Sequence, residues 1–195
     1  MKTPILLTGV LLAAVATWAQ APSAKPAATP GTIAQQLNRE LASVEHDVVP
    51  AAEAMPEDKY NFAPSAAIGN FNGVRTFAQE VKHIAAANYL IAGQILNQAP
   101  PVPYEENGPA NITSKADIVR FLKDSFAYAH KAFDTITLEN ATLPLKPGAR
   151  GTRLLEAADL PAHANDHYGQ MVEYLRMNGL TPPSSAGSPP ANPKK

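Results

Sequence analysis

Between two proline-rich ends, apolar residues of this chain recur at spacings of three and four, and clusters of proline or glycine interrupt the pattern. Such spacing gathers apolar side chains on one face of an α-helix, and no segment alternates as a half-buried strand does. A single amphipathic helix cannot bury its apolar face alone, so the four patterned segments predict an all-α, four-helix bundle. The order of the helices around the bundle is left open, because the connection from Glu139 to Gly151 is long enough to cross it.

The first two expected helices have recognisable ends. The first begins at Thr32, where Gln35 completes a capping box, and it ends before Pro56. The second carries its apolar positions from Val74 to Ile95 and stops at Pro100. Each of these two segments is long enough to form one full bundle helix.

The third and fourth helices are marked in the same way. The third begins at Ser114, with Asp117 placed for a capping box, and its apolar positions continue to Ile136. The fourth runs from near residue 152 to residue 178, and Pro161 should kink it or delay its regular part. Four helices of roughly 20 to 27 residues suit a bundle.

The first 21 residues have the pattern of a secretory signal peptide. Lys2 supplies the positive start, residues 5–16 form a short apolar stretch, and Ala19-Gln20-Ala21 fits a cleavage site. The apolar stretch is shorter than a membrane-spanning helix, so an uncleaved anchor is the second choice. We therefore expect an exported protein, periplasmic or secreted, that keeps no stable membrane span after cleavage.

The remaining chain divides by composition. Residues 22–31 form a linker rich in proline and alanine, residues 32–180 form the helical bundle, and residues 181–195 form a disordered tail rich in proline and serine. The two end segments contain too few apolar side chains to order themselves. One compact domain is the expectation.

Charge and cysteine content exclude several classes of function. Removing Lys2 from the 16 basic residues leaves 15 against 17 acidic ones, so the mature chain is close to neutral and has no nucleic-acid-binding character. The chain has no cysteine, which excludes disulfides and thiolate ligands. A bound metal would therefore be held by imidazole or oxygen donors, which favours zinc, nickel or iron.

Two histidines provide the best lead to chemistry. His163 and His167 are four residues apart and therefore share a face of the fourth helix, within an apolar stripe that also contains Leu160, Met171 and Tyr174. Buried imidazoles need partners.

His83 lies beside the apolar stripe of the second helix, next to small alanines that permit close helix approach. A three-histidine metal site formed by His83, His163 and His167 is one interpretation. Ordinary hydrogen-bonded core histidines are the other. His46 and His130 show no such pairing and are expected at the surface or its boundary.

Asp166 is the candidate catalytic residue. It lies about 60° around the helix from His163, where it could orient a ligand or act as a general base; the alternative is a solvated helix residue. The zincin pattern requires Glu after the first histidine, where this chain has Ala164, and the inverted form requires Glu before the second, where it has Asp166. A peptidase of either type is therefore not expected.

Three stretches together resemble one known family. They are Met55 to Pro64, then Val74-Arg75-Thr76-Phe77 leading to His83 and Asn88-Tyr89, and finally His163-x-x-x-His167-Tyr168-Gly169-Gln170 with Tyr174 to Gly179. Their order and spacing resemble the DinB/YfiT-like superfamily over roughly residues 32 to 184.

The resemblance implies a four-helix bundle that binds a divalent metal through His83, His163 and His167. Characterised relatives include thiol-dependent transferases and a thiol-dependent isomerase. Those relatives often carry Arg after the second histidine, where this chain has Tyr168, and an exported protein would be away from cytoplasmic thiols.

Two functions follow, with a third resting on composition alone. The first is an exported metalloenzyme, of thiol-transferase or hydrolase-like type, that acts on an unknown small molecule and uses zinc, nickel or iron. The second is a non-catalytic bundle that binds a metal or small ligand in the cell envelope. The third is an envelope scaffold that uses the proline-rich tail, and homodimer formation is left open.

Overall fold

A computed structural model describes residues 31–187 of the chain. The described part contains four α-helices, two short 3-10 helices and no strand, only a single isolated bridge between Pro144 and Thr152. The elements are α1 (Ile33–Ala54), η1 (Glu57–Lys59), α2 (Phe77–Leu96), α3 (Lys115–Phe133), α4 (Arg153–Met177) and η2 (Pro183–Ser185). The predicted all-α four-helix bundle is confirmed, while the predicted signal peptide and most of the linker lie outside the described residues.

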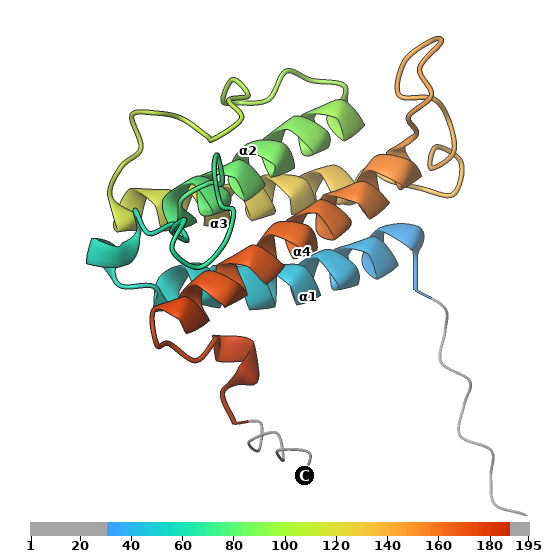
Figure 1. The fold of residues 1–195 in the computed structure, drawn as a ribbon. Helices are drawn as coiled ribbons and strands as arrows, with labels where there is room; N and C mark the ends of the chain where they lie inside the picture. Colours follow the sequence, from blue (N-terminus) through green and yellow to red (C-terminus); the bar gives the residue numbers. More distant parts are fainter. Residues whose placement is uncertain (1–30, 188–195) are drawn as a thin grey trace, which may run out of the picture. The chain divides into compact units, whose positions relative to one another are not determined.

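The structure settles the order of the helices, which the sequence left open. Helix α2 packs against α3 and α4, and α1 packs against the same two helices, so α1 and α2 lie on one diagonal. In Figure 1, α1 and α4 run in one direction and α2 and α3 run in the other. Because α2 and α3 are parallel neighbours, residues 97–114 must return along the length of the bundle, and they do so over α2.

Side-chain caps explain where the helices begin. The capping box of Thr32 and Gln35 is confirmed, and a second one, between Thr76 and Gln79, was not predicted. This second box starts α2 at Phe77, three residues later than the predicted apolar pattern. Val74 therefore lies outside the helix and is 39% exposed, so its assignment to the apolar stripe was wrong.

The later helix ends also differ in part from the prediction. Ser114 caps α3 by accepting the backbone N–H of Asp117, but it forms only this half of the predicted capping box. Helix α3 ends at Phe133 rather than continuing, although Ile136 remains buried. Helix α4 begins at Arg153, capped by Thr152, close to its predicted start, and continues through Pro161 to Met177.

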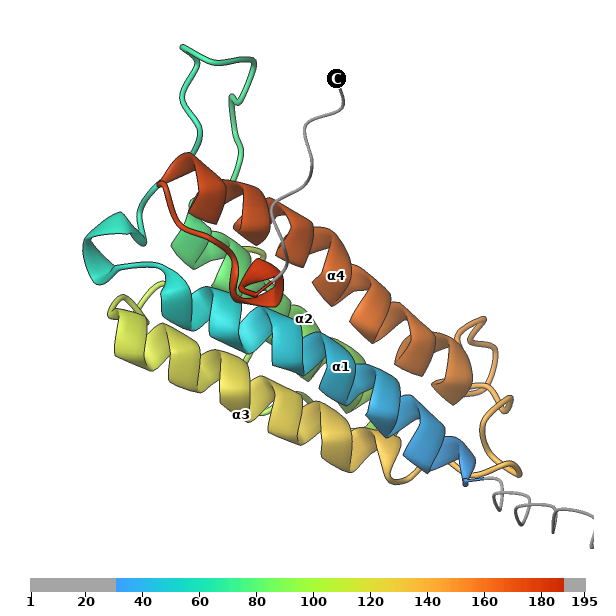
Figure 2. The same cartoon turned by 90° about the horizontal axis from the view of Figure 1, so that it is seen from below.

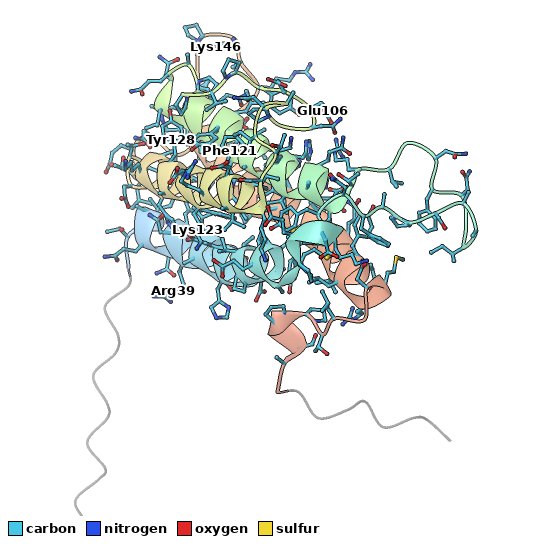
Figure 3. All side chains as sticks on the ribbon, turned by 90° about the vertical axis from the view of Figure 1, so that its left-hand side faces the viewer. Arg39, Glu106, Phe121, Lys123, Tyr128 and Lys146 are labelled. Carbon is cyan, nitrogen blue, oxygen red and sulfur yellow. The ribbon has the colours of Figure 1, made fainter. Side chains whose placement is uncertain are left out.

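The core is wider than one stripe per helix. On α3, both Phe121 and Phe126 are buried, because α3 packs against α1 and α2 at once. Figure 3 shows Phe121 on the flank of α3 beside α2. On α2, 16 of 20 residues are buried, since the connection 97–114 covers a side that would otherwise face solvent. Asn88 and Ser125 pair across α2 and α3 within this core, with Nδ2 3.1 Å from Oγ.

The C-terminal segment was predicted to be a disordered tail from residue 181 onward. In its first part, residues 181–187, η2 packs against α1, and Tyr168 of α4 donates a hydrogen bond to Ser184. Figure 2 shows this short helix beside α1 at the end of α4. Pro182, just before η2, is buried. The segment therefore buries apolar surface, which its composition did not predict. Residues 188–195 of the predicted tail lie outside the described residues. Within residues 31–187, no helix is both long enough and apolar enough to cross a membrane.

Candidate metal centre

Two neighbouring helices that run in opposite directions bring three imidazoles together. His83 lies in the first half of α2, and His163 and His167 lie one turn apart on the facing side of α4. The ring centroids are 5.0 Å apart for His83 and His163, 4.5 Å for His83 and His167, and 4.6 Å for His163 and His167. The three predicted residues therefore form a nearly equilateral cluster.

The ring nitrogens are close enough to share an ion. Nε2 of His163 is 3.1 Å from Nε2 of His83, and one nitrogen from each of the three rings lies within 4.8 Å of the others. Two imidazoles bound about 2.0–2.1 Å from one tetrahedral zinc ion have their nitrogens roughly 3.3–3.4 Å apart.

Hydrogen bonds behind two of the rings decide which nitrogen faces the centre. Nδ1 of His83 is bonded to the backbone oxygen of Glu106, which can only accept, so this nitrogen carries the proton. Nδ1 of His167 lies 2.7 Å from Oε2 of Glu80. In both rings the proton is then on Nδ1 and the lone pair is on Nε2, as in metal sites where a carboxylate or carbonyl orients a histidine. Without a metal, the Nε2 lone pair of His83 accepts from Nε2 of His163.

His163 is the third ring and differs from the other two. Its Nδ1 is buried and has no hydrogen-bond partner among the described residues, while its Nε2 lies 3.1 Å from Nε2 of His83, which can only accept when the His83 proton is on Nδ1. The proton of His163 is therefore on Nε2 when no metal is bound. His163 is also partly exposed, whereas His83 and His167 are buried. Access to the centre is therefore greatest on the His163 side.

Burial favours the neutral form of two of the site imidazoles, His163 and His83. Loss of solvent lowers the pKa of His163 to about 4, with further contributions from His167 and His83. Burial likewise lowers the pKa of His83. Since metal ions bind the deprotonated imidazole, these rings are already in the ligand form near neutral pH.

The carboxylates that contact the triad belong to Glu80 and Glu106, and Asp166 is not among them. Glu80 is 1% exposed and bonds His167 across the helix interface, whereas Asp166 is exposed. Among the described residues, Asp166 forms no hydrogen bond or ion pair with any histidine of the triad. One signal in the sequence could have indicated Glu80, since it precedes His83 by three residues and so shares its face of α2.

The other two histidines lie away from this centre, as predicted. His46 is exposed on α1. His130 of α3 is partly exposed and bridges to α1, where it contacts Asn38 and Glu45. Neither contributes to the cluster of imidazoles.

Comparison with known proteins identifies a family and supports the fold. A family model described as the DinB superfamily matches residues 40–175. A crystal structure of a conserved protein from Enterococcus faecalis superposes with a TM-score of 0.62 at 16% sequence identity, covering 76% of this chain and 98% of that one. At this identity the superposition supports the fold alone. None of the curated proteins matches the chain.

Proposed function

The chain belongs to the DinB superfamily, and from this we propose that it holds one divalent metal ion through His83, His163 and His167. The observation that carries the proposal is the convergence of the three rings, two of which have their Nδ1 atoms engaged by Glu106 and Glu80. Nitrogen donors without thiolates suit zinc or nickel, and iron is the next choice.

A metalloenzyme acting on a small molecule is the function that this centre supports best. Three protein ligands leave coordination positions open, and a divalent ion bound there would supply Lewis acidity and lower the pKa of a bound water or substrate group. Glu80 would hold the His167 ring in place, and the partly exposed His163 marks the side on which a substrate reaches the centre.

The class of reaction is narrowed by Tyr168. In relatives that carry out thiol-dependent chemistry, this position after the second histidine is often Arg. Here the Tyr168 hydroxyl donates to Ser184 of η2, 2.6 Å away, so the side chain belongs to the contact between α4 and the C-terminal segment. This favours hydrolase-like chemistry over thiol transfer.

A structural metal is the second candidate. His83 and His167 are 5% and 7% exposed, and the connection 97–114 contacts His83 through the backbone oxygen of Glu106. An ion held in that position would link α2 to α4 and stabilise the bundle without turnover. This candidate predicts a large effect of the metal on stability and none on any reaction.

Metal analysis of the tag-free mature protein tests the proposal. We expect about one divalent ion per chain, the stoichiometry of a single site. Removal of the ion by a chelator should lower the melting temperature. A free metal concentration 100 times the dissociation constant stabilises the folded state by about 2.7 kcal/mol, and this stabilisation is lost with the ion. Metal-dependent turnover in a panel of hydrolysable small molecules would favour the enzyme, and stabilisation without turnover would favour the structural role. A chain that retains no ion would overturn both.

We also propose that the bundle works outside the cytoplasm, in the periplasm or the medium. The proposal is supported by the order of features in residues 1–21: a positive charge at Lys2, the apolar stretch of residues 5–16, and the small residues Ala19 and Ala21 of a cleavage site. Expression of the full chain in a Gram-negative host should yield a periplasmic product that begins at Pro22, the residue that follows Ala21. N-terminal sequencing of that product identifies the cleavage point. Recovery of only the uncleaved chain from the cytoplasm would contradict export.

A further inference from the structure

One buried charged side chain next to the triad has no part in holding an ion. Lys82 immediately precedes His83 on α2 and is only 8% exposed. Its Nζ donates to the backbone oxygens of Pro109 and Ile112, at 3.0 and 3.2 Å, and both belong to the connection 97–114. A buried ammonium group requires such partners. Lys82 therefore ties the connection to α2 beside a proposed metal ligand.

A glycine allows the connection to come this close. Gly108 has a φ of +67°, a backbone conformation that L side chains rarely adopt. A Cβ atom at Gly108 would lie 2.5 Å from Cβ of Lys82 and 3.0 Å from its backbone oxygen. Any side chain at this position would push the connection away from Lys82.

Arg75, which precedes α2, holds the same part of the connection. Arg75 donates to the Asn107 side chain, with Nε 3.0 Å from Oδ1, and forms an ion pair with Glu106. The Tyr104 hydroxyl donates to the Glu106 carboxylate at 2.6 Å. Figure 3 shows Glu106 on the connection that lies over α2. These contacts fix the peptide whose backbone oxygen is bonded to Nδ1 of His83.

We propose that the connection 97–114 is a clamp that positions His83 as a metal ligand, and that Lys82 and Gly108 are its positioning residues. The inference rests on the proposed metal centre. The Glu106 carbonyl accepts a hydrogen bond from Nδ1 of His83 and so keeps the proton on that nitrogen. The lone pair of His83 is then on Nε2, which faces the proposed metal centre. Loosening the clamp would release this constraint while leaving all three histidines in place.

The tautomer of His83 tests the clamp without any metal. In the metal-free wild-type protein, ¹⁵N NMR of the imidazole rings should show His83 with its proton on Nδ1. Lys82→Met removes the two donated hydrogen bonds and should give a mixture of tautomers at this ring. Lys123→Met is the matched control, because Lys123 is exposed on α3 and pairs only with Glu53. An unchanged His83 signal in folded Lys82→Met would overturn the clamp.

Zinc affinity provides the second readout. Lys82→Met and Gly108→Ala, which act on the clamp from opposite sides, should each weaken zinc binding by about 10- to 100-fold, the usual effect of losing a group that orients a ligand. Circular dichroism establishes that each variant is folded, and either folded variant suffices for the test. Wild-type affinity in both would overturn the inference. If the wild type binds no zinc, the proposed function fails, whereas the tautomer measurement still decides the clamp.

Discussion

Replacing His167 with alanine is expected to abolish retention of a divalent ion. The substitution removes one of the three imidazoles and also leaves the buried Glu80 without the ring that it contacts. The loss of affinity should exceed the about 10- to 100-fold effect of removing a residue that merely supports a ligand. Equilibrium dialysis against zinc followed by elemental analysis measures the bound ion directly.

His46→Ala is the matched control for this experiment. The His46 side chain is 84% exposed on α1, and within residues 31–187 its one polar contact is with Asp47, so the variant should bind zinc as the wild type does. His163→Ala separates loss of a ligand from loss of folding, because no buried carboxylate depends on that ring. Wild-type zinc content in folded His167→Ala and His163→Ala would show that the triad is not the binding site.

Glu80→Gln should weaken metal binding without abolishing it. Glutamine keeps the size of the side chain and one oxygen that can accept a hydrogen bond from Nδ1 of His167. It lacks the negative charge that makes the imidazole a more basic, stronger metal ligand. We expect roughly 10- to 100-fold lower zinc affinity, measured by competition with a chromogenic chelator. Circular dichroism and thermal unfolding show whether the bundle is retained.

A second carboxylate–histidine pair provides the control for Glu80→Gln. Glu45 of α1 lies 3.1 Å from Nε2 of His130 on α3, so it also joins two helices through an imidazole, but away from the triad. Glu45→Gln should leave zinc affinity unchanged. Equal losses in the two variants would mean that the effect comes from weakened helix packing, and the orienting role of Glu80 would be wrong.

Much of the fold could be predicted because helix formation depends on residues close in sequence. The caps at Thr32, Ser114 and Thr152 satisfy backbone N–H groups only two or three positions away, and all three begin the helices expected from them. The burial of Phe126 could not be predicted in this way. It depends on α3 packing against two helices at once, which widens the apolar face beyond a single stripe.

The same distinction applies to the candidate site. The spacing of His163 and His167 is a property of one helix and therefore indicated their shared face. Asp166 was proposed from its place beside His163 on the same helix, and Glu80 was not considered. Glu80 and His167 are 87 residues apart, and their contact exists only because α2 and α4 pack side by side with Glu80 facing the interface.

The amino-acid sequence was enough to predict the four helices, the starts of most of them, and the three imidazoles worth considering. The order of the helices, the path of residues 97–114 over α2, and the partners Glu80 and Glu106 that orient His167 and His83 became visible only in the folded chain. The predictable features depend on residues close in sequence, and the others depend on residues far apart in sequence. Capping and periodicity act within a few residues, whereas the groups behind the proposed ligands are brought together by the packing of distant segments.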